Sequence, residues 1–109
     1  MNAPVPGPQS ADLLRRVRAW NVSAWRHADR IAQTRSALQR LADLAGAHDG
    51  LSRPAVPDAG VHALADQLHV LVDDALGSGA PAGEVEDILA DLATALGGAQ
   101  NRSRGHSGR

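Results

Sequence analysis

Apolar residues recur at helical spacing over three stretches of the chain. In the first stretch, no Pro or Gly interrupts the pattern between Ser10 and Gly46, and apolar residues follow intervals of three, four and seven. Ser10 is a suitable N-cap and Gly46 a suitable C-terminal residue, so the pattern predicts one long helix over residues 10–46. The polar, cap-type residues Asn21 and Ser23 leave open whether this helix is continuous, kinked or broken there. The expected apolar stripe consists of Leu13, Val17, Trp20, Ala24, Ile31, Leu38, Leu41 and Ala45.

Two shorter helices are expected downstream. Pro54 and Pro57 exclude helix from the connection over 47–57, and a second apolar stripe follows over residues 58–76. Pro81 occupies the favoured first position of a third helix over 81–96, which the Gly97-Gly98 pair is expected to end. The stripes consist of Val61, Leu64, Leu68, Leu71, Val72 and Leu76 in the second helix, and of Val85, Ile88, Leu89, Leu92 and Leu96 in the third.

Composition supports an all-α fold. The chain has 109 residues, of which 43% are hydrophobic and only 2% aromatic, and alanine and leucine supply most of the apolar content. We expect one helical domain over residues 10–96, preceded by a disordered Pro-rich leader (1–9) and followed by a disordered basic tail (97–109). The expected architecture is a three-helix antiparallel bundle built on the long N-terminal helix.

The helix lengths favour a homodimer. At 1.5 Å per residue the first helix would extend about 54 Å, whereas the second and third would extend about 28 Å and about 22 Å. Part of the first helix would therefore stay uncovered unless it kinks near Asn21 or meets a second copy of the chain.

Charge is unevenly distributed along the sequence, although the whole chain carries a formal charge of only −1. Residues 1–46 contain seven arginines and three acidic residues (+4), whereas residues 47–96 contain one arginine and nine acidic residues (−8). The chain contains no lysine. Opposite charges on neighbouring elements favour their docking, or attract partners of opposite sign.

The polar side of the first helix is the candidate protein-interaction surface. An ideal helix places Trp25 away from the apolar stripe and among arginines, and Trp and Arg are enriched at binding hot spots. The candidate residues are Leu14, Arg18, Val22, Trp25 and Arg26. We therefore expect a small non-enzymatic helical interaction or regulatory module that binds another protein, itself, or both.

Nucleic-acid binding is the alternative, since arginines beside an aromatic residue suit phosphate contacts and base stacking. The candidate residues are Arg15, Arg18, Arg26, Arg30, Arg102 and Arg104. Two observations count against it: the pI is about 6.5, and the acidic third helix would repel a phosphate backbone.

Catalysis and cofactor binding are not expected. The chain has no cysteine, and its serines and glycines form no nucleophile or phosphate-binding motif. His62, Asp66 and His69 share a helix face, but their spacing matches no familiar metal motif, so no metal site is assigned and binding at the two histidines is left open. No signal-peptide pattern or membrane-spanning run is visible, which favours a cytoplasmic protein without membrane contact.

Overall fold

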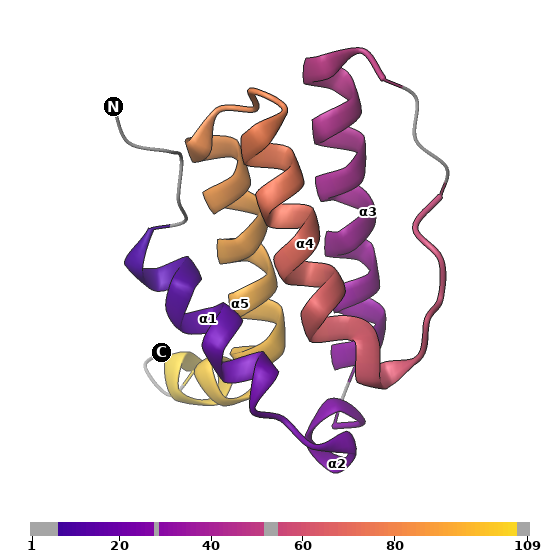
Figure 1. Cartoon of the computed structure of the whole chain (residues 1–109). Coiled ribbons are helices and arrows are strands. Elements are labelled where there is room, and N and C mark those ends of the chain that lie inside the picture. Colours follow the sequence, from indigo (N-terminus) through magenta and orange to yellow (C-terminus); the bar gives the residue numbers. More distant parts are fainter. Residues whose placement is uncertain (1–6, 28, 52–54, 107–109) are drawn as a thin grey trace.

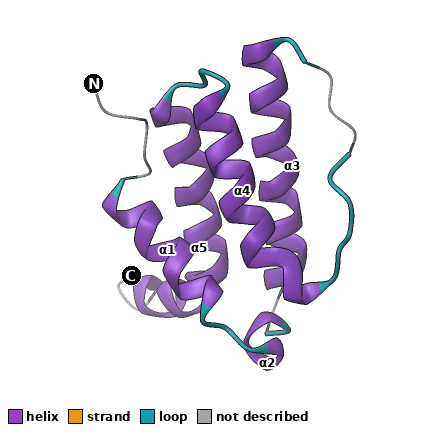
Figure 2. Ribbon diagram, viewed as in Figure 1, coloured by secondary structure: helices purple, strands orange, loops and turns teal. Residues whose placement is uncertain are grey.

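The computed structural model describes residues 7–27, 29–51 and 55–106, with side chains as far as Leu96. Within these ranges the chain forms helices and loops but no strand (Figures 1 and 2). The all-α prediction is therefore confirmed. The elements are α1 (Pro8–Arg18), α2 (Val22–Trp25), α3 (Arg30–Asp49), the one-turn 3₁₀ helix η1 (Val61–Ala63), α4 (Leu64–Gly77) and α5 (Ala82–His106).

The predicted long N-terminal helix is wrong, because the chain breaks twice where it was expected to continue. The first break follows Arg18, where Asn21 acts as the N-cap of α2 and its Oδ1 accepts the backbone N–H of Ala24 at 2.9 Å. The second separates Trp25 from Arg30. Asn21 therefore starts a new helix and does not merely kink an existing one.

The breaks allow both halves of the predicted helix to cover the same pair of helices. Both α1 and α3 pack against α4 and α5, which one straight helix of that length could not do (Figure 1). Apolar side chains from α1, α3, α4 and α5 meet in one core. Its most completely buried members are Leu13, Val17, Leu38, Leu41, Leu64, Leu68, Val72, Val85 and Leu89.

An extended segment after α3 sets the direction of α4. We call residues Ala55–Gly60 the strap. The Val56 N–H donates to Gln39 Oε1 at 3.0 Å, and farther along, Asp58 Oδ1 lies 3.3 Å from Arg35 Nη1, so the strap runs back along α3 towards its start.

As a result, α4 begins beside the start of α3 and runs parallel to it, while α5 is antiparallel to both (Figure 1). The predicted antiparallel three-helix arrangement is thus corrected to a packing of α1, α3, α4 and α5, in which α3 and α4 follow one another in sequence and run parallel. A short turn would have produced the antiparallel arrangement, whereas the strap lies along α3 from Gln39 to Arg35 before α4 begins.

The backbone conformation of individual glycines explains why three helix ends differ from the predicted ones. Gly46 stays helical, and α3 ends at Gly50, whose φ of 74° is the left-handed C-cap conformation. Gly60 has a φ of 91°, so the second helical segment begins at Val61 and not at Asp58. Gly97 has no positive φ, and α5 continues past the Gly97-Gly98 pair to His106.

The N-terminus of α1 also begins earlier than expected. Pro8 takes the first helical position, so the predicted N-cap Ser10 lies inside the helix. The Gly7 N–H donates to Glu86 Oε2 at 2.7 Å, and the Ser10 hydroxyl donates to Glu86 Oε1. Residues 1–6 of the predicted leader and 107–109 of the predicted tail lie outside the described residues.

Candidate interaction surface

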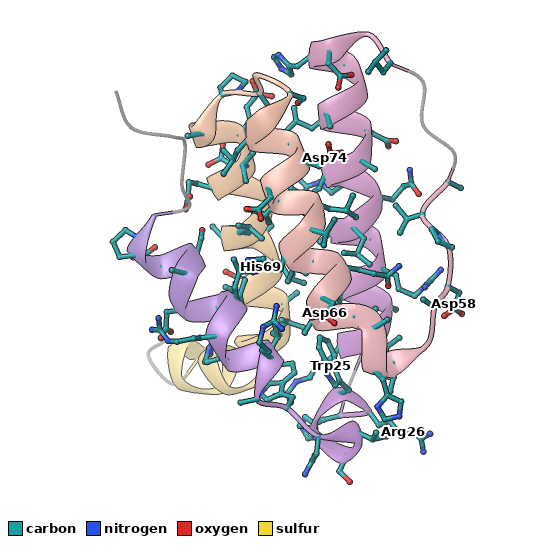
Figure 3. The ribbon with its side chains drawn as sticks, in the orientation of Figure 1. Trp25, Arg26, Asp58, Asp66, His69 and Asp74 are labelled. Atoms are coloured by element: carbon teal, nitrogen blue, oxygen red, sulfur yellow. The ribbon has the colours of Figure 1, made fainter. Side chains whose placement is uncertain are left out.

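Trp25, the centre of the predicted contact surface, lies in the core. It is 3% exposed, and its ring meets that of Trp20 edge to face, with centroids 5.0 Å apart and an angle of 82° between the planes. Figure 3 shows Trp25 reaching from α2 into the bundle, while Arg26 points away from it. Trp25 therefore does not lie on the polar side of a long helix as expected, because the break at Asn21 reorients α2 relative to α1.

Arg30 holds this tryptophan pair in place. Its guanidinium carbon lies 4.3 Å from the centroid of Trp20, within cation–π range. Its Nη1 donates to the Ala24 carbonyl at 2.8 Å and its Nε to the Leu96 carbonyl at 3.3 Å. Arg30 therefore joins α2, α3 and α5, and these donors are not free to bind a phosphate.

The other predicted interaction residues are only partly brought together. Arg18, Val22 and Trp25 line a hollow of about 230 Å³ between α1, α2 and η1, whereas Leu14, which is 7% exposed, and Arg26 are not among its lining residues. The predicted set is thus not one continuous surface.

The predicted nucleic-acid residues are also dispersed. Arg15 pairs with Asp12 at 2.9 Å, and Arg18 reaches from α1 to Asp66 on α4 at 2.8 Å. Arg26 is exposed and makes no ion pair within the described part of the chain. The side chains of Arg102 and Arg104 lie outside the described residues.

A different surface, an apolar groove between the strap and α4, has the form of a binding site. It has a volume of about 370 Å³. We call it the strap groove. Its walls are Ala42 of α3, Ala55, Val56 and Pro57 of the strap, Ala63 of η1, and Asp66, Gln67, Val70 and Leu71 of α4.

Two polar contacts keep the strap beside the groove. Gln67 Nε2 donates to the Pro57 carbonyl at 3.0 Å, and Gln39 accepts the Val56 N–H from the α3 side. Gln67 Oε1 is buried and has no hydrogen-bond partner among the described residues. These contacts join the strap to α3 and α4, and Gln67 contributes one buried acceptor.

Sequence reasoning missed this groove, although Val70 carried a signal for it. Val70 lies off the predicted apolar stripe of its helix and is 61% exposed. Its neighbours three and four residues away include Asp66, Asp73 and Asp74. A large apolar residue among acidic ones on a solvent-facing helix surface is typical of a contact position.

A second feature lies where α1 packs beside α4. Arg15 and Arg18 of α1 form a basic strip, and Asp66, His69 and Asp73 of α4 form an acidic strip next to it; we call the two together the α1–α4 face. Between the strips, Ala11, Leu14, Arg15, Arg18 and His69 line a hollow of about 170 Å³. Figure 3 shows His69 and Asp66 on the same side of the molecule as α1.

The histidines of α4 and η1 make no metal-binding cluster. In the described ranges no three His, Asp or Glu side chains are arranged to hold a metal ion. His69 lies instead 3.9 Å from Asp73, and Asp66 pairs with Arg18. None of the helices described is both long and apolar enough to cross a membrane.

Comparison with known proteins adds no relative. No protein-family model, curated protein or solved structure matches this chain. The surfaces of the protein are therefore the basis for proposing its function.

Proposed function

We propose that this protein is a small, non-enzymatic, helical protein-interaction module whose partner inserts an apolar side chain into the strap groove. The observation that carries the proposal is the groove itself, an apolar cavity of about 370 Å³ bordered by the exposed Val70.

The size and lining of the groove support binding and not catalysis. Small-ligand sites measure roughly 300–1,000 Å³, so the groove suits a few side-chain groups and not a large cofactor. Catalysis needs a nucleophile, a base and an electrostatic stabiliser that converge on one point. The only polar side chains among the groove's lining residues are those of Asp66 and Gln67.

One of these two polar groups also favours a particular kind of partner. Gln67 Oε1 is buried, whereas the Asp66 side chain is 69% exposed and can accept further hydrogen bonds beside its contact with Arg18. A partner that places an aliphatic side chain in the groove and a cationic or N–H group beside the Asp66 carboxylate would match both the apolar lining and this acceptor.

Filling the groove tests the proposal. In Ala63→Phe a ring would occupy the groove from η1, while Ala59→Phe adds the same ring at an exposed strap position that does not line the groove. Affinity capture from the native host, quantified by mass spectrometry, is expected to lose its specific partners with Ala63→Phe and to retain them with Ala59→Phe. Both variants are first checked for wild-type helicity and melting temperature. Identical capture by the two variants would contradict a role for the groove.

We further propose that the protein is a homodimer. The helix lengths expected from the sequence no longer support a homodimer, because the long first helix is broken into pieces that fold onto the bundle. The support now comes from the adjacent opposite charges of the α1–α4 face, which suit a self-complementary contact.

Nucleic-acid binding has less support. Arg18 and Arg30, two members of its predicted set, already contact Asp66 and two backbone carbonyls, respectively. An electrophoretic shift of DNA or RNA at about 50 mM salt that disappears at higher salt would revive this alternative.

A further inference from the structure

We infer that the homodimer forms through the α1–α4 face, with the basic strip of each copy lying over the acidic strip of the other. The inference rests on the proposed homodimer and adds its surface, its symmetry and the residues that specify it.

Both strips are accessible to a second copy. The side chains of Arg15 and Arg18 are 70% and 54% exposed, and those of Asp66, His69 and Asp73 are 69%, 47% and 67% exposed. The 2.8 Å contact between Arg18 and Asp66 shows that the strips are immediate neighbours. Each copy therefore presents positive and negative charge side by side.

Such a face is complementary to itself under one particular rotation. A two-fold axis that lies in the interface, runs along the helices and passes between α1 and α4 carries the basic strip of one copy onto the acidic strip of the other. A two-fold axis across the helices would instead place like charges together. Because α1 and α4 run in opposite directions (Figure 1), the favoured rotation also makes α1 of each copy antiparallel to α4 of its partner.

Apolar surface next to the strips supplies the rest of the contact. Exposed ion pairs each contribute only about 0–1 kcal/mol, so charge would set the orientation more than the affinity. Val70, which also lines the strap groove, is 61% exposed beside Asp66 and Asp73, and Ala11 lines the hollow between the strips together with Leu14, of which only 7% is exposed. Covering these side chains would remove apolar surface from water in both copies.

Two complementary variants test this arrangement without knowledge of the exact register. Arg15→Glu with Arg18→Glu makes the whole face acidic, and Asp66→Arg with Asp73→Arg makes it basic. Each variant alone is expected to raise the dimer dissociation constant at least about tenfold through like-charge repulsion. An equimolar mixture of the two is expected to recover a mass of two chains. The masses are measured by multi-angle light scattering at about 50 mM salt, where screening is weak.

The matched control reverses two acidic residues elsewhere. Glu84→Arg with Asp87→Arg changes the charge by the same amount at exposed positions of α5 and is expected to leave the dimer intact. Circular dichroism confirms that each variant folds, because both face variants lose the exposed Arg18–Asp66 pair.

The possible results distinguish the proposed dimer surface from the homodimer itself. A wild-type chain that stays monomeric at every concentration would overturn the homodimer and this surface together. A wild-type dimer that survives both face variants, or a mixture that fails to reassociate, would overturn the surface alone. Asp66 and Val70 line the strap groove as well, so partner binding there is tested separately by the Ala63→Phe comparison, which changes neither residue.

Discussion

Individual side chains connect elements that are distant in the sequence, and Glu86 is the clearest example. From α5 its carboxylate accepts hydrogen bonds from the Gly7 N–H and the Ser10 hydroxyl in the first turn of α1. The N-terminus of a helix carries unsatisfied N–H groups and a partial positive charge, so a carboxylate there is favourable on both counts. Glu86 thus acts as the cap that Gly7, which has no side chain, cannot provide.

Removing this carboxylate should weaken the fold. We expect Glu86→Ala to lower the free energy of unfolding by about 1–3 kcal/mol, since it deletes two hydrogen bonds to a charged, partly buried group. Asp87→Ala, at an exposed position of the same helix beyond its first turn, should change it by less than about 0.5 kcal/mol. Urea denaturation followed by circular dichroism compares the two, and equal effects would contradict the capping role of Glu86.

Thr34 presents the opposite case, a buried polar group without a partner. It is 0% exposed, and its hydroxyl has no hydrogen-bond partner among the described residues. Thr34→Val keeps the branched shape and removes the unsatisfied hydroxyl, so we expect it to stabilise the protein by about 1 kcal/mol. Thr94→Val, on the exposed side of α5, should be nearly neutral. Thermal unfolding measures both, and a loss of stability in Thr34→Val would show that the hydroxyl is satisfied.

At the scale of elements, apolar spacing predicted which residues are buried better than it predicted where helices end. The stripes of the second and third predicted helices supply Leu64, Leu68, Val72, Val85 and Leu89 to the core, as expected. The spacing itself could not reveal the breaks after Arg18 and after Trp25, because the flanking residues keep a helical period; only the polar residues Asn21 and Ser23 marked the first break as a possibility. Breaking the helix buries Trp25, which is a tertiary gain that a local pattern does not contain.

The candidate site was less predictable than the fold for a related reason. The strap groove needs Ala42, the strap and α4 to meet, and that meeting depends on hydrogen bonds from Gln39 and Gln67 across the fold. The proline-rich connection was expected to be non-helical, but its return along α3 was not. Among the groove residues, only the position of Val70 outside the apolar stripe pointed to this surface in advance.

Gly97 provides a test of where α5 ends. A glycine inside a helix is less favourable than alanine by about 1 kcal/mol, and a Cβ added at Gly97 would meet nothing within 4 Å. We therefore expect Gly97→Ala to increase helicity and stability by up to about 1 kcal/mol. If Gly97 instead ended the helix in a left-handed conformation, the same change would destabilise the protein.

Gly50 supplies the matched control for that measurement. Its φ of 74° is left-handed, and a Cβ there also has open space, so only backbone strain distinguishes the two sites. Gly50→Ala should destabilise the protein by about 1–2 kcal/mol. Opposite signs at the two glycines, measured by circular dichroism and denaturation, are the expected result.

On the scale of the whole molecule, the uneven charge of the sequence is partly used within the fold. Among the described residues, arginines of the basic first part pair with acidic residues of the second part at three places: Arg18 with Asp66, Arg35 with Asp58 and Arg40 with Asp91. These pairs join α1 to α4, α3 to the strap and α3 to α5, so docking of opposite charges assists the assembly of the bundle.

Salt should weaken this contribution. The pairs lie at or near the surface, where each is worth about 0–1 kcal/mol and is screened by ions. We expect a change from about 50 mM to about 1 M NaCl to lower the free energy of unfolding by about 1 kcal/mol. The measurement is made at a protein concentration low enough to exclude association. A double variant, Arg18→Gln with Arg40→Gln, should show a smaller dependence, and an equal one would contradict the role of these pairs.

The contact between Glu86 and the start of α1 has a consequence for synthesis of the chain. The ribosome synthesises α1 before α5, yet α5 supplies the carboxylate that caps α1 and an apolar face on which α1 packs. Leu13 and Val17 therefore remain without their final neighbours until the residues of α5 have been translated, and exposed apolar side chains make a growing chain prone to aggregate. Docking of α1 must wait for synthesis of α5.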